Sequence, residues 1–195
     1  MGATAVGIGA SAKANNSIAV GSQAVTEGQE STALGRRSYA GAQSATALGT
    51  GANASAIVST AVGNGAKASA VQASALGNEA KATGSSSTAI GVRSNSAGSS
   101  AIAVGTNSAA SANNAVSIGT GSKATGSEST AIGYASKAEG VNSMAMGRES
   151  SATHENSVAL GSYSVSKAEK SVKKRQLVLP PIMVLLVRHQ KELYL

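Results

Sequence analysis

A five-residue phrase that ends in glycine recurs along this chain at a constant spacing of fourteen residues. Examples are Ser31–Gly35, Ser87–Gly91 and Ser129–Gly133. The residue before the glycine is aliphatic or Met in twelve consecutive copies without an insertion or deletion: Val6, Val20, Leu34, Leu48, Val62, Leu76, Ile90, Val104, Ile118, Ile132, Met146 and Leu160. An unfolded linker has no reason to keep a constant phase, whereas a solenoid must, because each coil stacks on the one before it. The spacing therefore predicts a repeat fold.

Alternation with a period of two inside the phrase indicates a short strand. The residue two before the glycine is Ala in every copy except Ser117, so a column of small residues runs from Ala5 to Ala159. A second segment rich in Ala and Ser follows each glycine and predicts a second strand, with small residues inside and polar residues outside. The glycine itself suits a turn whose backbone conformation a Cβ atom would resist. We therefore expect an all-β fold, a parallel β-roll of about twelve 14-residue coils over residues 1–166.

The aliphatic residues and the alanines of the first strand occupy opposite faces. We expect the aliphatic side chains to point inward, into room left by the Ala and Ser of the second strand. Burial of one or two such side chains stabilises a coil by about 1.5–3 kcal/mol each, before the cost of ordering the backbone. The column from Ala5 to Ala159 would then lie outside, and its lack of polar residues suggests close approach by another chain. We therefore predict self-association through the alanine column as a symmetric ring of identical chains.

Composition and charge exclude several classes of function. The chain has no Phe, no Trp and 2% aromatic residues, so its interior must be thin. With no Cys and no Asp it has no disulfide framework, thiolate metal site, EF-hand loop or Asp-based catalytic pair. Residues 1–166 carry a net charge of only +2, and residues 167–195 carry +5. A nearly neutral repeat region is unlike a nucleic-acid-binding surface, and we assign no catalytic, cofactor-binding or metal-binding residue.

The fourteen-residue phrase, its Ala-rich second half and the final copy His154–Gly161 together resemble the head domain of trimeric autotransporter adhesins of Gram-negative bacteria, the YadA-like family. The resemblance covers residues 3–166. It implies a left-handed parallel β-roll, a homotrimer and display on the bacterial outer surface. It also implies a non-catalytic adhesin that binds host extracellular matrix such as collagen, or host cells, and mediates autoaggregation. The binding of such heads is spread over a repetitive surface, so no contact residue is carried over.

Residues 167–195 depart from that pattern, since no neck, coiled-coil stalk or membrane barrel follows. The apolar run Leu177–Val187 contains two prolines and is too short to span a bilayer. We interpret residues 167–195 as an anomalous basic and apolar tail, a truncated or frameshifted neck. The alternative is a short helix over Ile182–Leu195 that caps the roll or touches a membrane surface. Residues Met1–Val6 show no charged and apolar leader. We expect this chain to be a segment of a longer protein.

Several other interpretations of the repeat remain open. Lys67 with Lys81, and Lys123 with Lys137, share one column, which is either a solvated edge or a weakly basic stripe for an anionic matrix.

The column of Thr32, Thr46 and Thr60 resembles the threonine ladders of ice-binding solenoids, but interruption by Ile18 and Ile102 indicates that it faces inward. An ice-binding or other structural β-solenoid is the alternative function.

Two catalytic or ligand-binding motifs are weak matches. Gly49-Thr50-Gly51 fits part of a nucleotide fingerprint, but that fingerprint requires a helix after the turn, where a strand is expected. A hydrolase built on Ser157 and His154 would lack an Asp to orient the imidazole ring.

Overall fold

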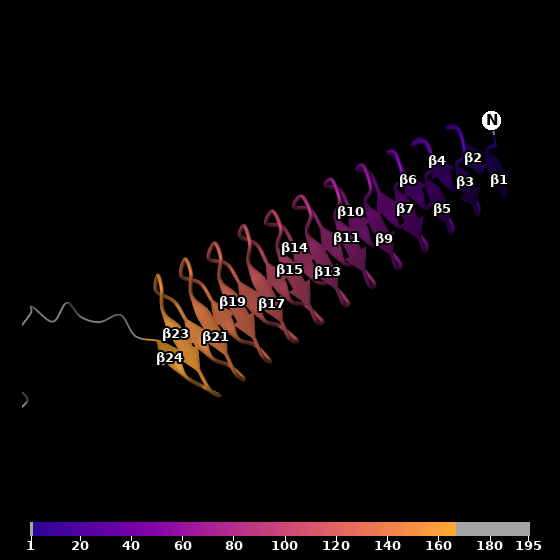
Figure 1. Cartoon of the computed structure of the whole chain (residues 1–195). Helices are drawn as coiled ribbons and strands as arrows, with labels where there is room; N and C mark the ends of the chain where they lie inside the picture. Colours follow the sequence, from indigo (N-terminus) through magenta and orange to yellow (C-terminus); the bar gives the residue numbers. More distant parts are fainter. Residues whose placement is uncertain (1, 167–195) are drawn as a thin grey trace, which may run out of the picture.

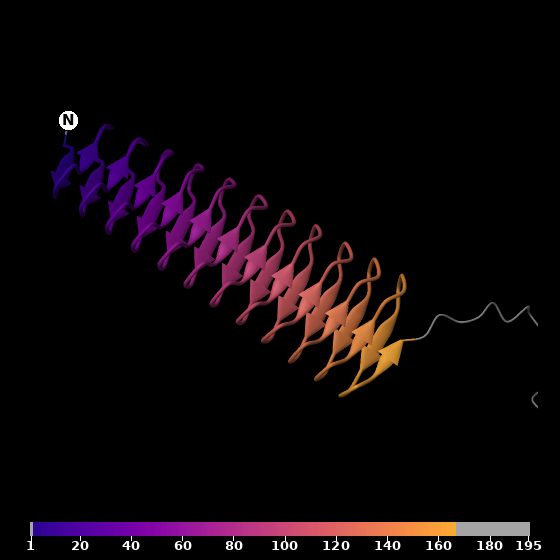
Figure 2. The same cartoon turned by 180° about the vertical axis from the view of Figure 1, so that it is seen from behind.

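The computed structural model describes residues 2–166, which form 24 short strands in two parallel sheets of twelve, with no helix among them. The chain winds as a flattened roll whose coils follow one another along a straight axis (Figure 1). The arrows of the two sheets point in opposite directions, because each coil runs up one sheet and down the other (Figure 2). The predicted all-β parallel solenoid of twelve coils is confirmed. The proposed second unit, residues 167–195, lies outside the described residues.

The odd-numbered strands form sheet A and the even-numbered strands form sheet B. Sheet A contains β1 (Thr4–Val6), β3 (Ile18–Val20), β5 (Thr32–Leu34), β7 (Thr46–Leu48), β9 (Thr60–Val62), β11 (Ser74–Leu76), β13 (Thr88–Ile90), β15 (Ile102–Val104), β17 (Val116–Ile118), β19 (Thr130–Ile132), β21 (Met144–Met146) and β23 (Val158–Leu160). Sheet B contains β2 (Ser11–Ala12), β4 (Val25–Thr26), β6 (Tyr39–Ala40), β8 (Asn53–Ala54), β10 (Lys67–Ala68), β12 (Lys81–Ala82), β14 (Asn95–Ser96), β16 (Ala109–Ala110), β18 (Lys123–Ala124), β20 (Lys137–Ala138), β22 (Ser151–Ala152) and β24 (Val165–Ser166).

Each strand pairs in register with the strand fourteen residues further along the chain. Ala75 lies beside Ala89 in sheet A, and Lys67 lies beside Lys81 in sheet B. The corners between the sheets are hydrogen-bonded from coil to coil as well, as by the amide of Arg37, which donates to the carbonyl of Ser22 at 2.9 Å. A single inserted residue would disrupt the pairing between the coil that contains it and the neighbouring coils. The constant fourteen-residue spacing of the sequence therefore follows from the pairing of each coil with the next. Successive strands lie about 4.8 Å apart.

The interior of the roll consists almost entirely of Ala and Ser side chains. Four positions of each coil point inward, two from each sheet; all are Ala or Ser except Thr26. Ala75, Ala80 and Ala82, from facing strands, are each 0% exposed. Because only side chains of this size separate the two sheets, the backbones lie too close to admit a Leu or Ile between them. The core is therefore thinner than the aliphatic phrase suggested.

The aliphatic residues of sheet A point outward, so the predicted assignment of the two strand faces was wrong. Leu48 is 39% exposed and Ile90 is 41% exposed, whereas the neighbouring alanines of the predicted outer column are buried. Alternation with a period of two separates the faces of a strand but does not say which face is inside. The alanine column is core, and it is not available to another chain.

Serine can replace alanine in this interior because the roll supplies a local acceptor for its hydroxyl group. The Ser38 hydroxyl donates to the carbonyl of Gly35 at 2.8 Å, and the Ser31 hydroxyl donates to the carbonyl of Gly28 at 2.6 Å. In both cases the acceptor is the turn carbonyl three residues earlier. A buried hydroxyl that finds a partner within its own turn costs little to bury. The buried hydroxyl groups of Ser87, Ser129 and Ser143 lack such a partner. The acceptor therefore favours serine in several coils, and small size is what all the inward positions share.

The glycine that ends each phrase is required for two reasons. Gly63 has a φ of 132°, a conformation that other residues rarely adopt. A Cβ atom there would lie 2.4 Å from the carbonyl oxygen of Gly77 in the next coil. The predicted role of this glycine is confirmed, and the close stacking of coils adds a steric reason to the conformational one.

Gly63→Ala is expected to destabilise the roll by about 2–6 kcal/mol, as the sum of backbone strain and a steric clash. Gly51→Ala is the matched control, because Gly51 has a φ of 66° with no atom within 4 Å of the added Cβ, and should cost only about 1 kcal/mol. Thermal unfolding followed by circular dichroism compares the two variants. Equal losses of stability in the two variants would show that the close stacking of coils is not the reason for glycine at position 63.

Candidate interaction surfaces

An aliphatic stripe covers the outer face of sheet A. We use this name for the outward-facing third residues of the sheet A strands: Val6, Val20, Leu34, Leu48, Val62, Leu76, Ile90, Val104, Ile118, Ile132, Met146 and Leu160. These side chains are exposed or half-buried, and in-register pairing places them in one unbroken row along the roll. A continuous apolar surface of this length is uncommon on a free protein and indicates a contact surface.

The first residues of the sheet A strands flank the stripe on the same outer face. Thr32, Thr46 and Thr60 are half-buried there, and Ile18 and Ile102 are 44% and 39% exposed. The prediction that the threonine column faces inward was therefore wrong, for the same reason as the aliphatic assignment. The outer face of sheet A combines a complete aliphatic row with a mixed row of hydroxyl and apolar residues.

The outer face of sheet B has a different chemistry, with polar residues and lysines. Lys67 and Lys81 are in-register neighbours, as are Lys123 and Lys137, and all four side chains are exposed. The predicted stacking of these lysines is confirmed, as is the polar outer side of the second strand. Because the inner faces of the sheets meet in the core, the aliphatic stripe and the lysines lie on opposite sides of the roll.

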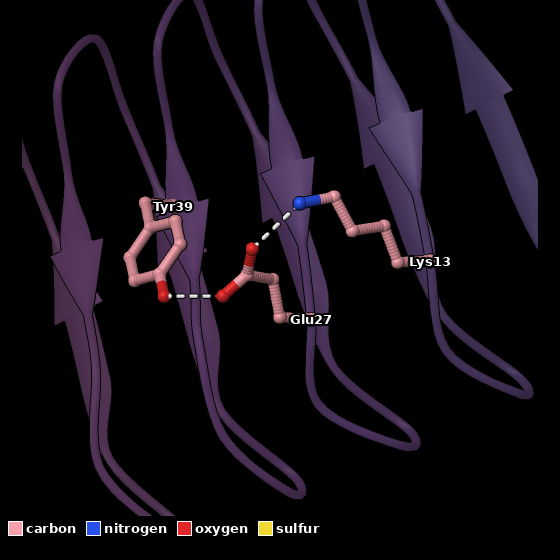
Figure 3. Close-up of polar contacts among 3 residues, drawn as sticks. All are labelled: Lys13, Glu27 and Tyr39. Carbon is pink, nitrogen blue, oxygen red and sulfur yellow. Dashed lines mark hydrogen bonds and ion pairs between the residues drawn. The ribbon is translucent and has the colours of Figure 1, made fainter.

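A small polar network joins three coils near the N-terminal end of sheet B (Figure 3). The Lys13 ammonium donates to Glu27 Oε1 at 2.7 Å, and the Tyr39 hydroxyl donates to Glu27 Oε2 at 2.8 Å. These bonds, that of Lys13 first, hold the pKa of the Glu27 carboxyl below its ordinary value. The bond to Glu27, assisted by partial burial, raises the pKa of the Tyr39 hydroxyl above its ordinary value. The network links neighbouring coils through side chains as well as backbone.

The lowered pKa of Glu27 means that its carboxylate stabilises the roll near neutral pH, and that this contribution is lost as the pH falls through the folded-state pKa. The melting temperature of Glu27→Gln should therefore lie slightly below that of the parent at pH 7, with the difference shrinking toward zero by about pH 2. Glu30→Gln removes the same charge outside the network and is the control. A pH-independent difference for Glu27→Gln would contradict the role given to its carboxylate.

The structure does not assemble the weakly matched catalytic and nucleotide motifs. The Ser157 hydroxyl donates to the main-chain carbonyl of His154 at 2.7 Å, while the imidazole Nδ1 pairs with the Thr153 hydroxyl at 3.0 Å. The turn at Gly49–Gly51 leads into strand β8, as expected, and not into a helix. Within residues 2–166 there is no group of three His or Glu side chains suited to a metal, and no helix long and apolar enough to cross a membrane.

One cluster was missed by the sequence analysis. The Arg148 guanidinium lies between two aromatic rings, 5.6 Å from the centroid of Tyr134 and 5.7 Å from that of Tyr163, and its Nε donates to Glu149 at 3.3 Å. Contacts of this kind stabilise by about 0.5–1 kcal/mol at exposed sites. Tyr134 and Arg148 are fourteen residues apart, so their shared column was the available signal. A pattern of repeated residue types does not reveal this cluster, because its members are unlike residues in one column.

Comparison with solved structures finds similarity to the crystal structure of the collagen-binding domain of Yersinia adhesin YadA, at 24% sequence identity. The alignment covers 87% of this chain and 78% of that chain, with a TM-score of 0.35. No curated protein sequence matches the chain.

The model of the YadA head domain repeat, which spans two copies of the repeat, matches overlapping windows from residues 1–24 to residues 138–164. These windows tile the roll almost from end to end, in phase with its coils. The chain therefore belongs to the family of YadA head domain repeats.

Proposed function

We propose that this chain is the self-associating head of a bacterial surface adhesin, which binds and does not catalyse. The observation that supports the proposal is the aliphatic stripe, an apolar row along one face of a roll whose opposite face is polar. Family membership supports the adhesive role and, through it, display outside the cell.

The stripe explains why a second copy of the chain is the expected neighbour. Each coil adds one aliphatic side chain at the same position, so the stripe of one roll matches that of an identical roll along its whole length. Burial of a side chain such as Leu48 removes apolar surface that the thin core could not cover. A closed ring of identical chains leaves no stripe exposed. We propose three chains in the ring, as the family resemblance implies.

The oligomer is expected to have three times the 18.9 kDa mass of one chain. Leu48→Glu combined with Ile118→Glu places two carboxylates in the stripe, and because a desolvated charge opposes association, the mass should fall to that of one chain. Multi-angle light scattering measures both masses.

Asn53→Glu combined with Ala109→Glu is the matched control, since it adds the same charge to the outer face of sheet B. This variant should keep the parent mass. A parent protein with the mass of one chain would exclude association. Equal dissociation of both variants would show that the stripe is not the contact surface.

We propose host extracellular matrix, with collagen as the first protein to test, as the ligand of this head. A repetitive surface presented three times favours binding by many weak contacts, in which effective concentration raises avidity by about 100- to 10,000-fold. Host-cell attachment and autoaggregation would follow from the same multivalent surface.

The parent chain should be retained on immobilised type I collagen at micromolar concentration and not on immobilised albumin. The Leu48→Glu, Ile118→Glu variant should bind at least 100-fold more weakly, because a single chain loses the avidity of the ring. Surface plasmon resonance gives both values. Equal retention on collagen and albumin would refute matrix-protein recognition while leaving the assembly intact.

A second candidate function is ice binding, which the outward threonines favour. Thr32, Thr46 and Thr60 stand on consecutive strands, about 4.8 Å apart, beside an aliphatic row. This function requires the outer face of sheet A to be free, whereas the proposed ring covers it. Ice shaping by a chain of single-chain mass would favour the second candidate.

A further inference from the structure

A hollow of about 340 Å³ lies on the corner between the two sheets near the C-terminal end of the roll. It is lined by Tyr134, Ala135, Lys137, Glu149 and Ser151, from two consecutive coils. The short side chain of Ala135 leaves space at a corner position where other coils carry long side chains such as Arg37 and Arg93. Its volume lies near the lower end of the range of small-ligand sites, about 300–1,000 Å³. It can therefore hold a ligand of one or two rings.

The lining brings together an aromatic ring, a cation, an anion and a hydroxyl group. Tyr134 is 55% exposed, and its ring centroid lies 5.6 Å from the guanidinium carbon of Arg148, which also pairs with Glu149. Lys137 is exposed, and no carboxylate of residues 2–166 forms an ion pair with it. A half-exposed ring held in place by a neighbour offers a preorganised apolar face. The free ammonium group beside it offers a site for a negative charge.

We infer that this hollow binds an acidic sugar residue, a sialic or hexuronic acid of a glycan. The CH face of a pyranose ring suits the Tyr134 ring, and the sugar carboxylate suits the Lys137 ammonium. Glu149 and Ser151 supply acceptors for sugar hydroxyl groups. A simple anion would not use the aromatic ring, and a neutral sugar would offer the lysine only a hydroxyl group. A sugar ring that carries a carboxylate uses both the Tyr134 ring and the charge of Lys137.

The chain contains a natural comparison four coils earlier. A hollow of about 190 Å³ in the same corner is lined by Glu79, Lys81, Arg93 and Asn95. It has a lysine at the place of Lys137, but Arg93 stands at the place of Glu149. This hollow is also smaller, and no aromatic residue lines it. The smaller hollow should attract anions without stacking on a sugar ring. A comparison of the two hollows therefore distinguishes recognition of a sugar ring from simple attraction of negative charge.

The inference goes beyond the proposed binding of matrix protein and does not depend on it. The hollow opens on the side of sheet B, whose outer face is opposite the aliphatic stripe, so assembly should leave it accessible. Loss of sugar binding would leave collagen retention and the mass of the assembly unchanged. The two proposals therefore fail independently.

The test is a saturation-transfer NMR titration of the full chain with a hyaluronan tetrasaccharide and with 3′-sialyllactose, and lactose is the neutral probe. One or both acidic probes should bind with a Kd on the order of 1 mM, and the probe that binds identifies the acid. Lactose should bind at least 10-fold more weakly.

Lys137→Gln should weaken binding of the acidic probe at least 10-fold, and Tyr134→Ala should weaken it about fivefold, with melting temperatures close to that of the parent. Lys81→Gln is the charge-matched control and should leave the Kd unchanged.

Four results would overturn the inference. These are absence of binding at 10 mM probe (about tenfold above the expected Kd), equal binding of lactose, equal loss in Lys81→Gln, and full competition by a hexaglutamate peptide. The last two would show that the surface attracts negative charge and does not recognise a sugar.

Discussion

The close approach of the two sheets is the constraint on which the rest of this structure depends. Only Ala, Ser and Thr26 stand between them. The coils are also packed closely along the axis, where a Cβ at Gly63 would meet the backbone of the next coil. The interior of the roll is therefore thin, and it contains only small side chains between two closely spaced backbone layers. Each buried methyl group contributes only about 0.8 kcal/mol, so the coil-to-coil hydrogen bonds, which continue through the corners, must hold neighbouring coils in place.

A thin core has a direct consequence for the aliphatic residues. Leu, Ile and Val are favoured in strands because their branched side chains pack on a pleated surface, yet this roll has no inner space for them. They occupy the outer face of sheet A in an unbroken row, where Leu34 is 43% exposed. An element that would form the core of an ordinary globular protein is thus placed where another chain can cover it. In the proposed ring, association supplies the apolar burial that the interior of the roll cannot supply.

The number, length and pairing of the coils followed from the sequence, because register is a property of spacing and spacing is visible in residues such as Gly35 and Gly49. The direction of the side chains did not follow, because the rule that aliphatic residues point inward presumes a core wide enough to admit them. A better signal was present: the inward columns admit only Ala, Ser and Thr26 across twelve copies, whereas the residue at the place of Thr32 varies among Thr, Ser, Ile, Val and Met. A column that tolerates only the smallest residues is sterically confined. The hollow beside Tyr134 could not be predicted in this way, because it arises from unlike residues of adjacent coils.

The outer face of sheet A differs from sheet B and the corners in which residues vary from coil to coil. On the outer face of sheet A the third strand residue is Val, Leu, Ile or Met in all twelve coils, as the proposed contact between identical chains would require. Substitution on sheet B and at the corners is free of that restriction, and it is there that Lys137, Arg148 and Glu149 occur. A head of this kind can therefore acquire a new ligand by changing corner residues in one or two coils, while the backbone pairing and the stripe remain as they are. In the proposed sugar site, recognition is local although the scaffold is periodic, because the fourteen-residue period fixes the positions of side chains and leaves their identities free.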